Sequence, residues 1–255
     1  MLDPAIFSSF KTITLEEMGK VRLMNRVDTK FVTTLATVQR ILERATAGYL
    51  LQQIDGESNM PYFTRYFDTP DMAMYHEHQR GKACRQKLRI RAYEGPATLS
   101  FLEIKDKNNR GRTRKTRVKL ENGNQFDDHT DFISEHLPYS PEGLQPVIEN
   151  HFYRVTLVNE ERTERITIDT ALEFHNLMNG ESVSFPNLGI IEWKRAGNGA
   201  RSAFGSLLRE FRVKQSGFSK YCIGLAITDE TLRQNRLKQK LRRIAKINAA
   251  SGEEK

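Results

Sequence analysis

The part of the chain that decides the fold is residues 80–119, RGKACRQKLRIRAYEGPATLSFLEIKDKNNRGRTRKTRVK. It holds fourteen Lys or Arg residues and three Asp or Glu residues, a net charge of +11, whereas the whole chain carries +8. The charges alternate with mostly apolar residues in three short runs, and successive side chains of a strand point to opposite faces. The stretch therefore predicts three consecutive strands with one charged face. The charged positions are Lys87, Arg89 and Arg91, then Glu103, Lys105 and Lys107, and then Lys115, Arg117 and Lys119.

This charged face has two interpretations. One is an antiparallel sheet with an ordinary solvated polar face. A solvated face usually mixes charges of both signs, whereas this one is nearly all cationic and rich in Arg, whose planar guanidinium suits phosphate oxygens. We favour the second interpretation, a sheet curled into a barrel or tunnel that is cationic inside and holds a polyanion.

Similar alternation returns in four other segments, before and after this stretch. The charged or polar positions on one face are Arg26, Asp28 and Lys30, then Arg154, then Arg165, Thr167 and Asp169, and then Glu192 and Lys194. Helical patterns interrupt these strands in residues 121–150 and 200–214. The arrangement predicts one α+β domain built around a closed sheet, with helices packed outside. A basic helix in residues 230–250 is expected to be solvated or to face a partner.

Composition limits the class of protein. No apolar run approaches the roughly 18 to 20 residues of a membrane span, and the first residues lack the pattern of a secretory signal. Cys84 and Cys222 are far apart, so we expect no disulfide framework or zinc site and a reducing, cytoplasmic compartment. His76 and His78 have poor helical spacing for a metal and are expected at the surface. The basic helix leaves membrane-surface association open.

A cationic tunnel suits phosphoryl transfer. Moving a γ-phosphoryl group requires charge neutralisation and in-line positioning more than covalent help. Lys and Arg supply the neutralisation, and Mg²⁺ or Mn²⁺ held by carboxylate oxygen adds to it. Glu192 is the first candidate metal ligand, because it shares a face with Lys194, and Glu103 is the second. Each could instead be an ion-pair partner inside a cationic barrel, which is the role we expect for Asp169.

Eight short segments, in this order, resemble the VTC domain, the polyphosphate polymerase branch of the triphosphate tunnel metalloenzymes. They are Arg26-x-Asp28-x-Lys30-Phe31, Tyr66-Phe67-Asp68-Thr69, Lys87-Leu-Arg89-Ile-Arg91, Glu103-Ile-Lys105, Tyr153-Arg154, Arg165-Ile-Thr-Ile-Asp169, Ile191-Glu192-Trp193-Lys194 and Phe218-Ser219-Lys220-Tyr221. The resemblance implies an eight-stranded antiparallel tunnel in residues 21–228, after a connector in 1–20 and before a basic helix and tail in 229–255. It further implies transfer of the terminal phosphate of ATP to a growing polyphosphate chain.

The resemblance also implies the site residues. The expected catalytic residues are Lys30, Lys87, Arg89, Arg91, Lys105, Lys115, Arg117, Arg154, Arg165, Lys194, Ser219 and Lys220. Among them, Arg89, Arg91, Lys105 and Lys220 would bind the nucleotide, and Glu192 and Glu103 would hold Mn²⁺ or Mg²⁺. We expect the cations of residues 115–119 to guide the product chain outward. The ExExK signature of the superfamily's hydrolases and cyclases is absent, which argues against a thiamine triphosphatase or an adenylate cyclase.

Other functions stay open at this point. A nucleic-acid binder would place aromatic residues among its cations, whereas here the two alternate apart, so we expect no nucleic-acid partner. A module that binds polyphosphate or inositol phosphates without turnover would have the same walls and no need of a metal carboxylate. A tripolyphosphate hydrolase of the same superfamily is a further alternative, and a membrane-protein partner that accepts the product is not excluded.

Overall fold

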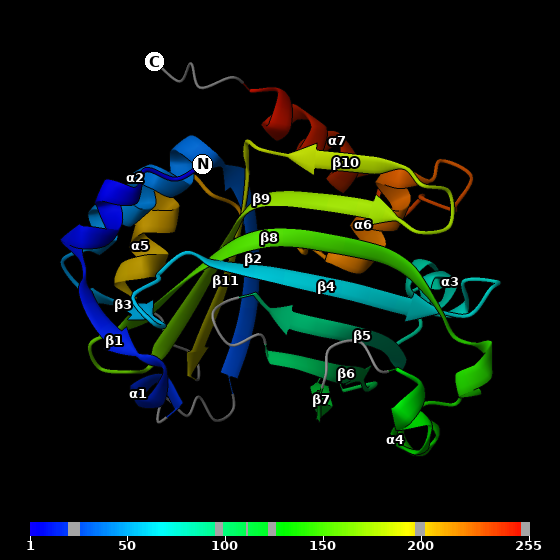
Figure 1. The fold of residues 1–255 in the computed structure, drawn as a ribbon. Helices are drawn as coiled ribbons and strands as arrows, with labels where there is room; N and C mark the ends of the chain where they lie inside the picture. The colour runs from blue at the N-terminus through cyan, green and yellow to red at the C-terminus, as the bar shows by residue number, and fades with distance from the viewer. Residues whose placement is uncertain (20–25, 95–98, 111, 122–125, 197–201, 251–255) are drawn as a thin grey trace.

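The computed structural model describes residues 1–19, 26–94, 99–110, 112–121, 126–196 and 202–250, and its centre is one curved sheet (Figure 1). Eight strands are joined by antiparallel pairing in the order β2, β11, β9, β8, β4, β5, β6, β7. Their bounds are Arg26–Thr34 for β2, Leu188–Ala196 for β11, Glu164–Asn176 for β9, Gln145–Asn159 for β8, Met60–Asp68 for β4, Arg85–Tyr93 for β5, Leu99–Lys107 for β6 and Thr113–Leu120 for β7. Three short strands bring the sheet to eleven: β1 (Lys11–Thr14) pairs with β3 (Tyr49–Gln53), which pairs with β8, and β10 (Ser182–Phe185) pairs with β9.

The α+β class and the antiparallel sheet are confirmed, but the closed eight-stranded tunnel is wrong. Within the described residues, β2 and β7 are the two edges of the main path, and no ladder joins them. Alternation along a strand tells which side chains share a face, but it does not tell which strands pair.

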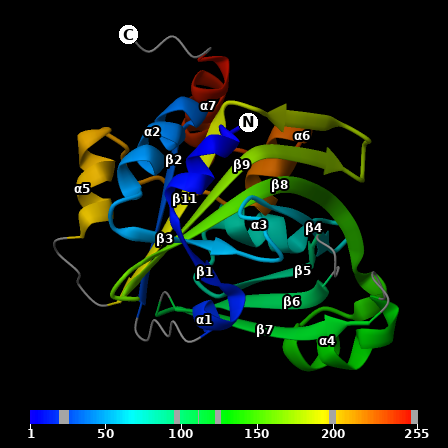
Figure 2. The same ribbon diagram turned by 60° about the vertical axis from the view of Figure 1, so that its left-hand side comes forward.

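The sheet nevertheless curls until its two ends approach each other (Figure 2). The pKa of Lys105 on β6 is lowered chiefly by Arg89 on the neighbouring strand and by burial, and also by Lys30 on β2. Since β2 and β6 are separated by five strands in the sheet order, Lys30 acts on Lys105 across the concave side. The result is an open half-tunnel.

Helices cover the convex face. The 3₁₀ helix η1 (Pro4–Ser9) and the helices α2 (Leu35–Ala45) and α5 (Ala203–Glu210) pack on outward apolar residues of β2, β8, β9 and β11, such as Ile168 and Ile191. The helix α4 (Thr130–His136) packs on outward residues of β5 and β6, such as Ile90 and Leu102. Three further short helices are α1 (Leu15–Gly19), η2 (Asp127–His129) and η3 (Pro141–Gly143). In the described part of the chain, no helix is both long and apolar enough to cross a membrane.

One extra residue in β9 divides the concave face into two parts. Between the pairs His151–Glu173 and Tyr153–Thr170, β9 has one residue more than β8, and Ala171 takes a positive φ of 48° there. Before this bulge, Asp169 points inward; after it, Leu172 and Phe174 do. A β-bulge re-aims side chains in this way, so the same strand is charged at one end of the half-tunnel and apolar at the other.

The apolar end is filled by α6 (Lys220–Thr228). The helix packs on Ile148 and Phe174, and a Cβ on Gly224 would lie 2.5 Å from the Phe174 ring, so only glycine permits this close approach. The helices α3 (Ala73–Arg80) and α7 (Lys238–Ala249) complete this cluster through Tyr75 and Ile244. The N-terminus of α6 therefore faces the charged part of the half-tunnel.

Candidate functional site

The charged part of the concave face is built by neighbouring strands in register. Arg89 pairs with Glu103, Arg154 with Asp169, and Glu192 with Lys30. Because each strand places alternate residues on this face, the predicted site residues from distant parts of the sequence meet here. The structure brings together Lys30, Lys87, Arg89, Arg91, Glu103, Lys105, Lys115, Arg154, Asp169, Glu192, Lys194, Ser219 and Lys220.

Glu103 lies at the centre of a buried ion-pair group. Its carboxylate, whose side chain is 0% exposed, accepts hydrogen bonds from Arg89 Nε at 2.9 Å and Nη2 at 2.5 Å, and from Lys115 Nζ at 3.1 Å. Burial alone would raise the pKa of Glu103, but Arg89, Arg91 and Lys115 outweigh it and hold the pKa well below its usual range. Glu103 is therefore ionised and fixes the Arg89 guanidinium in place.

Asp169 forms a second group with a cation from the helix α6. Its two oxygens accept hydrogen bonds from Arg154 Nε at 2.6 Å and Nη2 at 2.8 Å, and one also accepts from Lys220 Nζ. The Lys220 ammonium also lies 3.8 Å from the centre of the Phe152 ring. Burial lowers the pKa of Lys220 to about 7, although Asp169 opposes the shift. Lys220 can thus change its charge near neutral pH.

Glu192 is more accessible than the inward carboxylates Glu103 and Asp169. Its oxygens lie 2.7 Å from Lys194 Nζ and 3.6 Å from Lys30 Nζ, and its side chain is 21% exposed. Burial would raise its pKa, but Lys30 and Lys194 hold the pKa far below the usual range. Among the described residues, no arginine forms an ion pair with Glu192, whereas arginines pair with Glu103 and Asp169.

Arg91 and Lys105 have no carboxylate partner within 4 Å in the described residues, and neither has Lys87, which donates its hydrogen bond to Ser219 Oγ. Burial lowers the pKa of Arg91, with Arg89 as the next cause, and no hydrogen bond reaches Arg91 Nε. Arg89 and burial lower the pKa of Lys105 well below its usual value, and within the described part of the chain its ammonium makes no ion pair. Like charges held together in a partly buried wall raise the free energy of the empty site. An anion among them would remove that cost.

Ser219 and Lys220 begin α6. Ser219 is the N-cap, its Oγ accepts from Cys222 N at 3.3 Å, and it also accepts from Lys87 Nζ at 2.8 Å. The first turn of α6 contains no acidic residue, so its backbone N–H groups and Lys220 together favour an anion at this point.

Two predicted residues lie at the margin of the site. Arg165 on β9 is half-buried opposite Lys194. Arg117 is exposed on the edge strand β7, with its guanidinium 4.3 Å from the centre of the Phe101 ring. Neither is as deeply placed as Arg89 or Arg91.

The sequence reasoning missed the aromatic floor of the site. Tyr66 Oη accepts a hydrogen bond from Arg89 Nη1 at 3.3 Å, and the guanidinium of Arg154 lies 4.9 Å from the centre of the Tyr62 ring. Both tyrosines come from β4, where residues 60–68 read MPYFTRYFD. The alternate spacing of Tyr62, Thr64 and Tyr66 was the available signal, since the same period-two rule places them on one face.

A divalent ion fits here only with its substrate. In the described chain, no three His, Cys, Asp or Glu side chains converge on one point. Arginines engage Glu103 and Asp169, so Glu192 is better able than either of them to take a cation. A single carboxylate suits Mg²⁺ or Mn²⁺, which are often held by one or two carboxylates, water and substrate phosphates.

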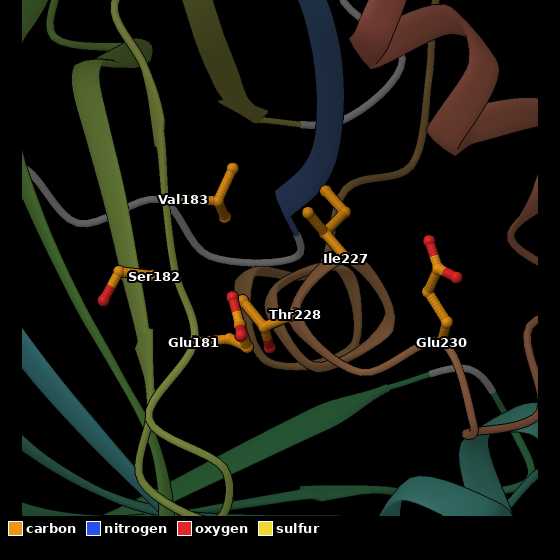
Figure 3. Close-up of a pocket in the computed structure, with 6 residues that line it drawn as sticks. All are labelled: Glu181, Ser182, Val183, Ile227, Thr228 and Glu230. Atoms are coloured by element: carbon orange, nitrogen blue, oxygen red, sulfur yellow. The ribbon is translucent and has the colours of Figure 1, made fainter.

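A separate hollow of about 370 Å³ lies at the other end of α6 (Figure 3). It is lined by Glu181, Ser182, Val183, Ile227, Thr228 and Glu230. This lining has two carboxylates and no cation, so it does not suit a polyanion. The candidate site is the charged half-tunnel.

The fold was compared with solved structures. Among solved structures, a candidate adenylate cyclase from Bacillus halodurans has a TM-score of 0.51 at 16% identity, over 77% of this chain and 96% of that chain. A candidate adenylyl cyclase from Hippeastrum with a dominant triphosphatase activity has a TM-score of 0.49 at 15% identity, over 81% and 97% of the two chains. A protein from Pyrococcus horikoshii has a TM-score of 0.45 at 15% identity, over 79% and 98%. The likeness to the Bacillus structure concerns the fold alone.

No curated protein matches the sequence. Residues 25–228, however, match the family model of the VTC domain, and they include every strand of the main path of the sheet. They also include the whole of the charged half-tunnel and the helix α6 that closes its apolar end. The chain belongs to the VTC domain family.

Proposed function

We propose that the protein is a polyphosphate polymerase, which transfers the γ-phosphate of ATP to the end of an inorganic polyphosphate chain. The observation that carries the proposal is the surplus of positive charge on the concave face, where Arg91 and Lys105 lack any carboxylate partner in the described residues. A phosphoanhydride chain supplies about one negative charge per phosphate along a line. Membership of the VTC domain family supports the same assignment.

The length of the charged face favours a chain over a single phosphate. From Lys87 to Arg91, β5 advances four residues, roughly 13 Å at the rise of a strand, and cations continue on β6 and across the face on β8 and β11. Several consecutive phosphates can therefore be contacted at once. The rigid Arg89–Glu103 and Arg154–Asp169 pairs hold the arginines in position before the substrate arrives, which reduces the ordering cost of binding.

The residues have separate roles in the transfer. Arg91 and Lys105 bind phosphate oxygens of the nucleotide and neutralise their charge. Lys220 and the N-terminus of α6 orient the reacting phosphates. An oxygen of the chain's terminal phosphate forms a bond to the γ-phosphorus while the bond from that phosphorus to the ADP oxygen breaks, and ADP leaves. Cations placed around the transferred group stabilise its charge without any covalent intermediate with the protein.

Glu192 is the residue that we assign to the divalent ion. Its carboxylate is partly accessible and touches only lysines, whereas the oxygens of Glu103 are engaged by Arg89 and Lys115. Glu103 accordingly fits the role of a positioning residue better than that of a second metal ligand. Mn²⁺ or Mg²⁺ held at Glu192 would supply further neutralisation of the phosphate charge.

The test is incubation with ATP and Mn²⁺ or Mg²⁺, followed by gel separation of the phosphate products. Polymers longer than the triphosphate of ATP support the proposal. Inorganic phosphate without polymer would indicate a hydrolase instead, and tight tripolyphosphate binding without any turnover would indicate a binding module. Nucleotide-free tripolyphosphate should be run in parallel, since a hydrolase of this fold would cleave it.

A further inference from the structure

A second group of basic side chains lies outside the half-tunnel, where α3 ends and α7 begins. We call it the basic mouth and define it as His78, Arg85, Arg236 and Lys240. Arg236 packs directly on Gly81, the C-cap of α3, so closely that a Cβ there would lie 1.5 Å from Arg236 Nη1. Arg85 is held beside it, because its Nη1 donates a hydrogen bond to the carbonyl of Lys82 at 2.7 Å.

The basic mouth is continuous with the transfer site. Lys87, which follows Arg85 on the same face of β5, donates a hydrogen bond to Ser219 Oγ at 2.8 Å. Lys240 Nζ lies 3.3 Å from the position that a Cβ on Gly217 would take, two residues before Ser219. Positive groups therefore lead from the N-terminus of α6, past Lys87, to the basic mouth.

The imidazole of His78 shows how closely these cations gather. Expected at the surface, it is half-buried, and its Nδ1 has no hydrogen-bond partner in the described residues. Burial is the largest cause of a pKa lowered to about 3, and the other causes are the positive charges of Lys87, Arg85, Lys240 and Arg236. All four cations thus lie near one neutral ring.

The described chain supplies no carboxylate to balance the basic mouth. With carboxylates of the described residues, none of Arg85, Lys87, Arg236 and Lys240 forms an ion pair; the nearest pair along the chain, Lys82 with Glu77, uses another lysine. The helix α7 begins with a lysine, has Lys240 in its first turn, has no acidic residue in that turn and has no side-chain cap. Positive charge at a helix N-terminus is unfavourable, so an anion at this point would be doubly favoured.

We propose that the basic mouth binds the phosphates of the polyphosphate chain that extends beyond the transfer site. The inference rests on the proposed polymerase function and adds a second, chain-holding site to it. Packing by α6 fills the apolar end of the half-tunnel, so a chain that passes Ser219 has to turn toward α3 and α7. Arg236 and Lys240 lie beyond residues 25–228, the part that matches the family. This path replaces the cations of β7 as the expected guide for the chain.

The first test measures binding without turnover. Wild type should bind medium-chain inorganic polyphosphate more tightly than tripolyphosphate, because only the longer chain reaches the basic mouth. The variant Arg236→Ser/Lys240→Ser should lose about 3- to 30-fold in affinity for the longer chain, the effect of two exposed charge contacts, and keep its affinity for tripolyphosphate. The matched control Arg242→Ser/Lys246→Ser removes the same charge from exposed positions of α7. An equal loss in the control, or an equal loss for tripolyphosphate, overturns the inference.

The second test measures product length during turnover with ATP. Arg236→Ser/Lys240→Ser should shorten the polymer at an unchanged initial rate of ADP release, whereas Arg117→Ser should not shorten it. Unchanged product length overturns the inference. If no polymer forms even with wild type, the proposed function fails, and the binding test alone decides whether the basic mouth holds phosphate chains. Sedimentation with phosphatidylglycerol vesicles tests whether the basic mouth binds lipid phosphate instead of polyphosphate. The inference is overturned if vesicle binding depends on Arg236 and Lys240 while affinity for polyphosphate does not depend on its chain length.

Discussion

Lys105→Met should stabilise the empty protein and weaken its binding of phosphate. The ammonium is half-buried, has no ion-pair partner in the described residues, and faces Arg89, Arg91 and Lys30. Methionine has a similar length and no charge, and replacing even a buried ion pair by packed apolar groups is often neutral or gains 1–4 kcal/mol. Because Lys105 is only half-buried, we expect about 1–2 kcal/mol of extra stability, which at 2–4 °C per kcal/mol raises the Tm by about 2–8 °C.

The same substitution should cost affinity. A hydrogen bond from a charged donor contributes about 1.5–3 kcal/mol, so the Kd for tripolyphosphate should rise about 10- to 150-fold. Thermal unfolding followed by circular dichroism gives the Tm without ligand, and isothermal titration calorimetry gives the Kd. Lys214→Met, at an exposed position after α5, is the control and should change the Tm by less than about 2 °C.

The stability gain should also depend on pH with a definite sign. The pKa of Lys105 is below 10.5 in the folded protein and near 10.5 in the unfolded chain. Between these two values the unfolded chain binds more protons, so the stability of the wild type rises with pH. The advantage of Lys105→Met therefore shrinks as the pH rises toward 10. A Tm lower than that of the wild type at pH 7, or an unchanged Kd, would refute the reasoning that Lys105 is an unpaired cation held for the ligand.

Three further predictions concern the inward acids and Lys220. Glu103→Gln leaves the Arg89 guanidinium buried without its counter-charge and should lower the free energy of unfolding by about 3–5 kcal/mol in urea titrations; Glu121→Gln, an exposed acid after β7, should not, and equal losses would contradict a buried pair. Glu192→Gln should remove most ATP turnover with Mn²⁺ while the Kd for tripolyphosphate without metal stays within a few-fold; near-normal turnover would exclude Glu192 as a metal ligand. Lys220 loses its proton as the pH rises through about 7, so wild-type affinity for tripolyphosphate, divided by that of Lys220→Arg, should fall about fivefold between pH 7 and 8; a flat ratio would show that Lys220 carries no ligand-binding charge.

The parts of the site that sequence could predict are those set by strict local periodicity. Arg89 and Arg91 share a face with Lys87 because side chains alternate along any strand, whatever strand lies beside it. The end of α3 depends on local sequence in the same way, because Gly81 takes a φ of 77° that other residues adopt only with strain. In both cases a few neighbouring residues contain the whole physical cause.

The parts that could not be predicted depend on residues far apart in the chain. Whether β2 pairs with β7 depends on how far the whole sheet curls, and the sequence of a single strand does not determine that curvature. The low pKa of His78 comes partly from Lys240, more than 160 residues away in the sequence, across a contact that only the packed helices create. The pairing of Glu103 with Arg89 required knowing the register of β5 on β6, which a one-residue slip would change.

The position of the bulge at Ala171 sets how far the charged part of the half-tunnel extends along β9, and this length can change only in fixed steps. If β9 ran without a bulge but kept all its residues, alternation from Asp169 would turn Glu173 and His175 inward beneath α6 and Leu172 and Phe174 outward, so the extra residue is what keeps the apolar side chains inside. The bulge can move along β9 only in steps of two residues, about 7 Å along the strand, and each step exchanges one inward residue for its neighbour in the chain. We therefore expect relatives with longer or shorter channels to differ in the position of this bulge by an even number of residues along β9. The same rule would apply to a redesign that lengthens the channel.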